Sequence, residues 1–130
     1  MNIESSAWVA ILLLEPAEAR LRAAIERDPL RITSAATVFE VSMVLDSRLG
    51  RRAVIEFQED LQEMGVTIVP VDAPQAWAAL EAFRTYGKGR HPAGLNFGDC
   101  FSYALSKVTG QPLLFVGDDF ARTDIAAVSW

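Results

Sequence analysis

Near its C-terminal end the chain reads Pro112-Leu113-Leu114-Phe115-Val116-Gly117-Asp118-Asp119. The four apolar residues are too few for a helix, and Pro112 and Gly117 bound them, so the stretch predicts a buried strand. A short strand that is apolar throughout is typical of a parallel sheet covered by helices. The stretch therefore predicts an α/β fold with two carboxylates directly after one of its strands.

The remainder of the chain predicts strands and helices in alternation. Further strands are expected at 1–5, 30–33 and 66–71, with another candidate at 127–130. Helices are expected at 6–14, from Pro16 onward, and at 35–49, 52–64, 74–86 and 97–109, several of them ending at a glycine. This alternation predicts a parallel α/β sheet flanked by helices, in a single domain of residues 1–130.

The composition excludes several kinds of site. One cysteine, Cys100, and one histidine, His91, rule out an internal disulfide, a Cys-rich zinc site and a His cluster. The early apolar run 7–14 is far shorter than the roughly 20 residues that span a membrane, and Glu4 precedes it where a signal peptide would carry positive charge. We therefore expect a cytoplasmic protein without membrane contact, in which any metal has oxygen ligands.

Acidic residues follow two of the predicted strands. Glu4 closes the first strand, and Asp118 and Asp119 follow Val116. Ligands of parallel α/β sheets bind beyond the carboxyl ends of the strands, so these positions indicate a site. The alternative for Asp118 and Asp119 is a helix cap or a turn, which aspartate often occupies.

Two further acids lie in predicted helices. Glu40 has apolar neighbours on nearly every side, which predicts a buried helix and a carboxylate that must bind a metal or pair with Arg20 or Arg48. Asp99 lies in the first turn of its helix, after a possible N-cap at Asn96. Its alternative role is to complement the helix dipole, a contribution of about 0.3 to 1 kcal/mol.

Taken together, these carboxylates fit phosphodiester hydrolysis. A group of three or four carboxylates that binds Mg²⁺ or Mn²⁺ can neutralise charge on a phosphate and lower the pKa of an attacking water. The net charge of −5 argues against broad electrostatic binding of nucleic acid. A metal bound by converging acids would reverse the local field where a phosphate must lie.

Several segments resemble the VapC toxins, which are PIN-domain ribonucleases of type II (VapBC) toxin-antitoxin systems. The start Met1-Asn2-Ile3-Glu4-Ser5-Ser6-Ala7 is similar to the family's Ile-Asp-(Thr/Ser)-Ser-Ala opening, and the stretch from Tyr86 to Cys100 resembles a distinctive segment of one VapC subgroup. Glu40 and the stretch from Leu113 to Phe120 are similar to the remaining motifs. The resemblance extends over essentially the whole chain.

The resemblance implies a PIN-like three-layer α/β/α fold with a short, mainly parallel central sheet. It also implies an acidic pocket that binds one or two Mg²⁺ or Mn²⁺ ions, and cleavage of specific RNAs, often tRNA or ribosomal RNA. Its site would comprise Glu4, Glu40, Asp99 and Asp119 as ligands, Asp118 close by, and Ser6 and Asn96 as supporting residues. It also implies homodimers and a cognate VapB antitoxin that covers the active site. Operator DNA would be bound only through that antitoxin.

The chain departs from the family at its most characteristic position, where Glu4 stands in place of aspartate. The extra methylene displaces the carboxylate by about 1.5 Å. Mg²⁺ requires nearly ideal octahedral geometry, and a misplacement of about 1 Å in an active site can lower a rate about 100-fold. The backbone could compensate for this displacement, Mn²⁺ could be the preferred ion, or most of the activity could be lost. We expect reduced but not absent activity, which Glu4→Asp should raise.

A basic loop precedes Asp99 and contains Lys88, Arg90 and His91. These cations could bind RNA phosphates beside the metal, or they could simply keep a solvated loop soluble. The apolar residues around Trp8 and Ile11 exceed what one buried helix face requires. They could therefore contact a second subunit or the antitoxin, or they could belong to the core.

Three functions remain open from the sequence. The first is a metal-dependent ribonuclease toxin. The second is a catalytically weak module that acts mainly by binding its antitoxin and contributing to repression of its operon, an alternative that Glu4 supports. The third is a receiver-like or phosphatase-like domain. Such a domain requires an aspartate at the end of a central strand, and the predicted strand ends near Thr33 and Val71 do not provide one, although Asp72 lies nearby.

Overall fold

The computed structural model describes residues 1–130 and contains one four-stranded sheet. Its strands are β1 (Asn2–Ile3), β2 (Ile32–Ser34), β3 (Thr67–Val69) and β4 (Leu113–Leu114). The strand order is β3-β2-β1-β4, and every neighbouring pair is parallel. The expected parallel sheet is therefore confirmed.

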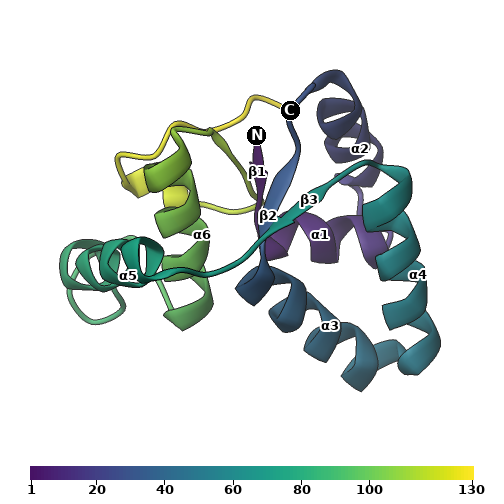
Figure 1. Ribbon diagram of the computed structural model, residues 1–130, viewed down its shortest axis with the longest axis horizontal. Coiled ribbons are helices and arrows are strands. Elements are labelled where there is room, and N and C mark those ends of the chain that lie inside the picture. Colours follow the sequence, from purple (N-terminus) through teal and green to yellow (C-terminus); the bar gives the residue numbers. More distant parts are fainter.

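Six α-helices surround this sheet: α1 (Ser5–Leu12), α2 (Glu18–Arg27), α3 (Ala35–Leu49), α4 (Arg51–Glu63), α5 (Ala73–Tyr86) and α6 (Phe97–Thr109). A 3-10 helix, η1 (Phe120–Arg122), follows β4. Figure 1 shows α5 and α6 on one side of the sheet and α1, α2 and α4 on the other, while α3 extends from the end of β2. This arrangement confirms the expected α/β/α layers. None of the helices is long and apolar enough to cross a membrane.

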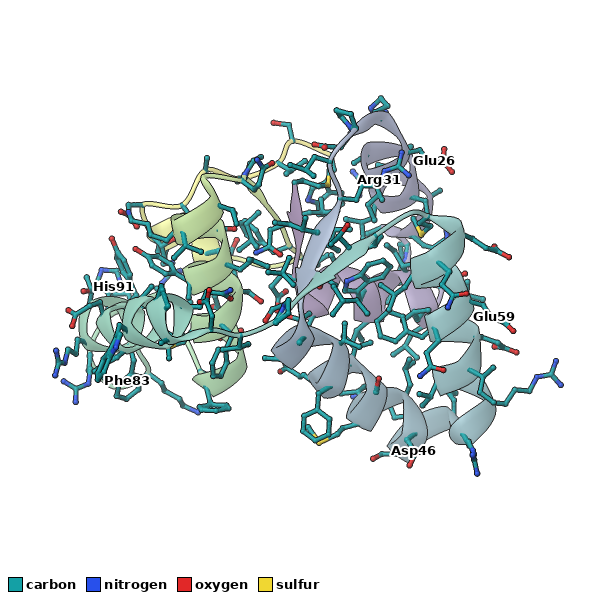
Figure 2. All side chains as sticks on the ribbon, viewed as in Figure 1. Glu26, Arg31, Asp46, Glu59, Phe83 and His91 are labelled. Atoms are coloured by element: carbon teal, nitrogen blue, oxygen red, sulfur yellow. The ribbon has the colours of Figure 1, made fainter.

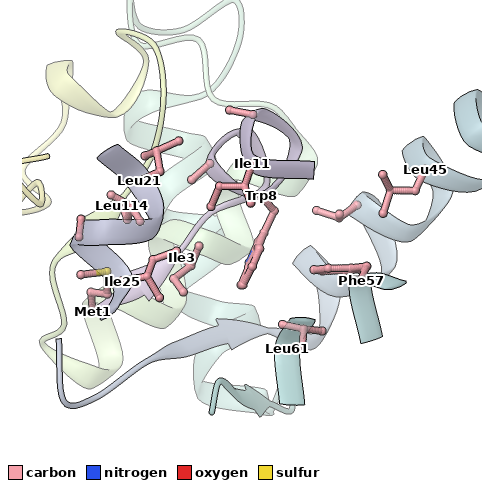
Figure 3. Packing of buried hydrophobic residues seen from close by; sticks show 14 residues of the cluster. Met1, Ile3, Trp8, Ile11, Leu21, Ile25, Leu45, Phe57, Leu61 and Leu114 are labelled. Atoms are coloured by element: carbon pink, nitrogen blue, oxygen red, sulfur yellow. The ribbon is translucent and has the colours of Figure 1, made fainter. Parts of the chain in front are cut away.

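Each face of the sheet has its own core. The larger core joins α1, α2, α3 and α4, and Figure 3 shows Trp8 and Phe57 meeting within it. Their ring centroids lie 5.3 Å apart. Trp8 and Ile11 are completely buried, so the core alternative holds for both, whereas Leu14 is 77% exposed. The smaller core packs α6 against α5 and β4.

Several boundaries differ from those expected. The first helix begins at Ser5, and its N-cap is Glu4 rather than Ser6, because the Glu4 carboxylate accepts a hydrogen bond from the Ser6 backbone N–H. The strand expected at 127–130 is reduced to one bridge between Leu113 and Ala127. The other strands are shorter than predicted: β2 starts two residues later than expected, and β4 ends two residues earlier.

The prediction that the Glu40 helix is buried on nearly every side is wrong. In α3 only Thr37, Val41 and Leu45 are buried, and Phe39 and Met43 on the opposite side are exposed. The helix is therefore covered on one face only. A large apolar surface stays open beside Glu40.

Candidate active site

An acidic cleft of about 320 Å³ lies at the carboxyl ends of β1 and β4. Its lining residues are Glu4, Ser5, Ser6, Val9, Glu40, Val41, Val44, Arg48, Asn96, Asp99, Val116, Asp119 and Phe120. Four of them are carboxylates from four separate segments of the chain. The sequence separates Glu4 from Asp119 by more than a hundred residues, and the fold brings them to one cleft.

The parallel sheet explains this convergence. Glu4 directly follows β1, and β4 lies beside β1 in the same direction, so the segment after β4 carries Asp119 to the same edge. The helix α3 starts directly after β2 and brings Glu40 in its second turn. The N-terminal end of α6 supplies Asp99.

The Glu4 carboxylate is buried, with 2% of the residue exposed, and is well supplied with hydrogen-bond donors. Oε1 accepts from Ser5 Oγ at 2.5 Å, and Oε2 accepts from the Ser6 backbone N–H at 2.6 Å and from Ser6 Oγ. Both oxygens are therefore engaged by the first turn of α1. The longer side chain of glutamate folds back as the cap of this helix.

Ser6 connects the Glu4 carboxylate to the neighbouring strand. Its Oγ donates to Glu4 and accepts from the Val116 backbone N–H at 2.9 Å. Val116 itself lines the cleft between β4 and Asp119. Ser6 thus fixes Glu4 relative to the segment that carries Asp119, and its contacts agree with the supporting role that the resemblance implies.

The Glu40 carboxylate lies between α3 and α6 and lacks comparable partners. Its Oε2 atom is buried without a hydrogen-bond partner, and Glu40 belongs to none of the ion pairs in the structure. The expected alternative, pairing with Arg20 or Arg48, is therefore absent. Burial, and after it repulsion by Glu4, raises the pKa of Glu40, although the nearby Ser5 hydroxyl acts in the opposite direction.

Gly98 makes room for the Glu40 carboxylate. A Cβ atom at position 98 would lie 2.8 Å from Glu40 Cδ, closer than Cβ contacts in proteins allow. Glycine is unfavourable in a helix by about 1 kcal/mol relative to alanine. The first turn of α6 therefore tolerates a poor helix former at the one position where a side chain would collide with an acid of the cleft.

Asp99 has the most perturbed carboxyl group of the cleft. Its Oδ2 accepts from the Asn96 backbone N–H at 2.7 Å, while Asn96 Oδ1 accepts from the Asp99 backbone N–H at 3.0 Å, which forms a capping box. Burial raises the pKa of Asp99 to about 6, and repulsion by Glu4, Glu40 and Asp119 adds to this effect despite the Asn96 hydrogen bond.

The cleft has the chemistry of a site for a hard divalent cation. It offers carboxylate oxygens without sulfur or imidazole ligands, one of these oxygens is buried and unpartnered, and repulsion among the acids raises a pKa. As the side chains stand, no three of them converge on one point. Glu4 is turned toward Ser5 and Ser6, so a cation that used all four acids would require this side chain to rotate.

The structure does not bring every predicted residue to the cleft. Asp118 and Asp119 are both exposed, and only Asp119 lines the cleft. Lys88, Arg90 and His91 also lie outside the cleft lining. Figure 2 shows His91 at the α5 end of the molecule, far from the end of α3.

The sequence analysis missed two residues that line the cleft, Ser5 and Arg48, and one that lies beside it, Gly98. Ser5 donates to Glu4, Gly98 accommodates Glu40, and Arg48 lines the cleft without forming an ion pair. A glycine in the first turn of a predicted helix was the available signal for Gly98. Arg48 lies two turns beyond Glu40 on the same helix face, a spacing that the sequence does contain.

Comparisons with known proteins agree with this geometry. The PIN domain model matches residues 1–126. Ribonuclease VapC of Mycolicibacterium smegmatis is 53% identical over 128 residues, which are 98% of this chain and 99% of that protein. Ribonuclease VapC30 of Mycobacterium tuberculosis is 51% identical over 129 residues, which are 99% of this chain and 98% of that protein.

Solved structures share the fold at lower sequence identity. The crystal structure of Mycobacterium tuberculosis VapC20, a toxin that cleaves the sarcin-ricin loop, superposes with a TM-score of 0.79 at 22% identity and covers 98% of this chain and 97% of its own. A toxin-antitoxin complex from Klebsiella pneumoniae gives a TM-score of 0.75 at 14% identity, with 98% and 95% covered. The family model and the full-length relatives together establish that this chain belongs to the VapC branch of the PIN-domain family.

Proposed function

We propose that this protein is a Mg²⁺- or Mn²⁺-dependent endoribonuclease and the toxin of a VapBC-type toxin-antitoxin pair. The observation that carries the proposal is the convergence of Glu4, Glu40, Asp99 and Asp119 on one cleft. Relatives that match nearly the whole chain are named ribonucleases. The proposed substrate is RNA of the tRNA or ribosomal RNA class, in keeping with the resemblance.

The four carboxylates would hold the cation. When bound, it supplies positive charge for the scissile phosphate and lowers the pKa of an attacking water. The chain's own residues position the acids: Ser6 holds Glu4, Asn96 holds Asp99, and Gly98 admits Glu40. Such positioning matters because a misplaced group in an active site can cost about 100-fold in rate.

Cleavage of total RNA by the purified chain tests the proposal, with Mg²⁺, Mn²⁺ or EDTA in parallel. Asp99→Asn removes a charge from the cleft, and Asp118→Asn makes the same change at an exposed position outside it. We expect cuts at defined sites that require the metal, persist in Asp118→Asn and are lost in Asp99→Asn. Cleavage that persists in EDTA would refute the proposed metal dependence. Equal cleavage by Asp99→Asn and Asp118→Asn would refute the proposed site.

The contacts of Glu4 favour a second candidate function, in which the chain is a weak catalyst that acts mainly by binding its antitoxin and contributing to repression of its operon. Both Glu4 oxygens accept hydrogen bonds from Ser5 and Ser6, so this carboxylate would have to give up part of that bonding to bind a cation. Under this candidate Glu4→Asp should raise the cleavage rate by up to about 100-fold. An unchanged rate would exclude attenuation by Glu4.

We further propose that the partner of the chain is a VapB-like antitoxin and that the chain forms a homodimer. Phe39, Met43 and Phe97 are exposed apolar residues beside the cleft, and Phe97 is 81% exposed. Exposed apolar surface of this kind is typical of interaction sites. One structural neighbour is itself a toxin-antitoxin complex.

The partner proposal is tested with the antitoxin encoded beside this chain. We expect that antitoxin to suppress RNA cleavage and Phe97→Ser to weaken the suppression. Light scattering on the purified chain reports whether it is a dimer in solution. A monomeric mass, or cleavage unaffected by the antitoxin, would contradict the respective part of this proposal.

A further inference from the structure

Arg48 is the one basic residue that lines the acidic cleft. It lies in the last turn of α3, and Glu40, Val44 and Arg48 follow one another at four-residue spacing along the face that borders the cleft. Eight residues of helix correspond to about 12 Å. Arg48 therefore stands at the opposite end of the cleft wall from the carboxylates.

The guanidinium of Arg48 has no partner within the chain. It belongs to none of the six ion pairs, although four carboxylates line the same cleft. Its neighbour Arg52 pairs with Glu56 at 2.9 Å on the outer side of α4. Arg48 is also exposed, so it keeps all of its hydrogen-bond donors available for a ligand.

The chemistry of this position suits a phosphate. A guanidinium presents a planar fork of donors that matches phosphate oxygens, and a chain with a net charge of −5 needs local cations to bind a polyanion. The other basic group, Lys88, Arg90 and His91, lies on the loop between α5 and α6 and does not line the cleft. Figure 2 shows His91 at the far end of the molecule from Asp46, which lies near the end of α3.

We propose that Arg48 binds a backbone phosphate of the RNA strand, away from the bond that is cut, and so fixes the path of the strand along α3. The inference rests on the proposed ribonuclease function. A separation of about 12 Å corresponds to roughly three stacked nucleotides at 3.4 Å each. Arg48 is a positioning residue for the substrate, and base identity plays no part in this contact.

Binding of a short fluorescein-labelled single-stranded RNA tests this role by anisotropy, over a series of KCl concentrations. Ca²⁺ replaces Mg²⁺ here, because it takes oxygen ligands and lets binding be measured apart from cleavage. The variants are Arg48→Ala, Arg48→Lys and the matched control Arg51→Ala, an arginine that does not line the cleft and forms no ion pair. Thermal melts report whether each variant folds.

Arg48→Ala should weaken binding about tenfold and reduce the slope of log affinity against log salt by about 0.7, the value for one phosphate contact on a single strand. Arg48→Lys should retain the slope with an intermediate affinity, because it keeps the charge and loses the fork. Arg51→Ala should match the wild type. Equal affinity and slope in Arg48→Ala and Arg51→Ala would overturn the inference.

The two proposals fail in distinguishable ways. If the wild type binds this RNA through Arg48 but does not cleave RNA with Mg²⁺ or Mn²⁺, the ribonuclease proposal fails and the phosphate contact stands. If the wild type cleaves RNA and Arg48→Ala has the same KM and salt dependence, only the Arg48 inference fails. If the wild type neither binds nor cleaves, both fail.

Discussion

The two walls of the acidic cleft differ in how they accommodate their buried carboxylates. On the α1 wall, the buried Glu4 carboxylate receives hydrogen bonds from Ser5 and from both the backbone and the side chain of Ser6. On the wall between α3 and α6, Glu40 has an unpartnered buried oxygen, and burial raises the pKa of Asp99 to about 6.

This difference indicates which carboxylates of the cleft destabilise the folded state. A buried carboxylate that accepts several hydrogen bonds is largely compensated, whereas a buried charge beside other charges destabilises the fold. The α3–α6 wall therefore retains electrostatic strain that a bound cation would relieve. Its acids are arranged for a ligand, while Glu4 already satisfies its own hydrogen-bonding needs.

The largest expected effect comes from filling the space that Glu40 occupies. Gly98→Ala should lower RNA cleavage about 100-fold, because the new Cβ would displace the Glu40 carboxylate. The free energy of unfolding should change little, because that carboxylate is the end of a flexible side chain and can move aside. At an ordinary helix position the same change would stabilise by up to about 1 kcal/mol. RNA cleavage assays and urea denaturation measure the two effects.

A double-mutant cycle tests the cause of the Gly98→Ala effect. In a Glu40→Ala background the alanine at position 98 no longer meets a carboxylate, so Gly98→Ala should stabilise the fold there by up to about 1 kcal/mol. If Gly98→Ala has the same effect on stability in both backgrounds, the collision with Glu40 is not the reason for the glycine. Backbone packing around position 98 would then be the reason for the glycine.

The next effect concerns the charge of Asp99 in the absence of metal. The folded chain keeps the Asp99 proton until its pKa of about 6, whereas the unfolded chain releases it near 3.8. Between these values the folded chain binds more protons, so its free energy of unfolding falls as pH rises. In EDTA at neutral pH, Asp99→Asn should be more stable than the wild type by up to about 3 kcal/mol.

Denaturation across pH checks this prediction. The advantage of Asp99→Asn should disappear below about pH 4, where both side chains are neutral. Asp118→Asn is the matched control, and as an exposed change it should leave stability within about 0.5 kcal/mol. Mg²⁺ should stabilise the wild type more than Asp99→Asn, since a ligand stabilises the state that binds it. A destabilised Asp99→Asn in EDTA would show that the capping box outweighs the repulsion.

Much of the fold could be predicted because local signals and topology agreed. The apolar run before Gly117, the caps at Ser34 and Asn96, and the stop at Gly110 placed strands and helices within a few residues. Parallel strand ends then implied that acids after β1 and β4 would meet. The convergence of Glu4 and Asp119 on one cleft agrees with that expectation.

Side-chain direction was harder to predict, because it depends on contacts between distant segments. Asp118 and Asp119 are adjacent in sequence, but only Asp119 lines the cleft. The apolar neighbours of Glu40 suggested burial on all sides, whereas Phe39 and Met43 are exposed. The pattern of one helix does not reveal which of its faces the rest of the protein leaves uncovered.

The smallest effect separates the two serines of the α1 wall. Both hydroxyls donate to Glu4, but only Ser6 also accepts from the Val116 backbone N–H. Ser6→Ala should therefore cost about 1 kcal/mol of stability, because it leaves that N–H without its partner, while Ser5→Ala should cost about half as much. Denaturation of both variants, with RNA cleavage measured beside it, tests this ranking. If Ser5→Ala lowers the stability more than Ser6→Ala does, then the Ser5 hydrogen bond is the main support of Glu4. The hydrogen bond between Ser6 and Val116 would then contribute little to this wall of the cleft.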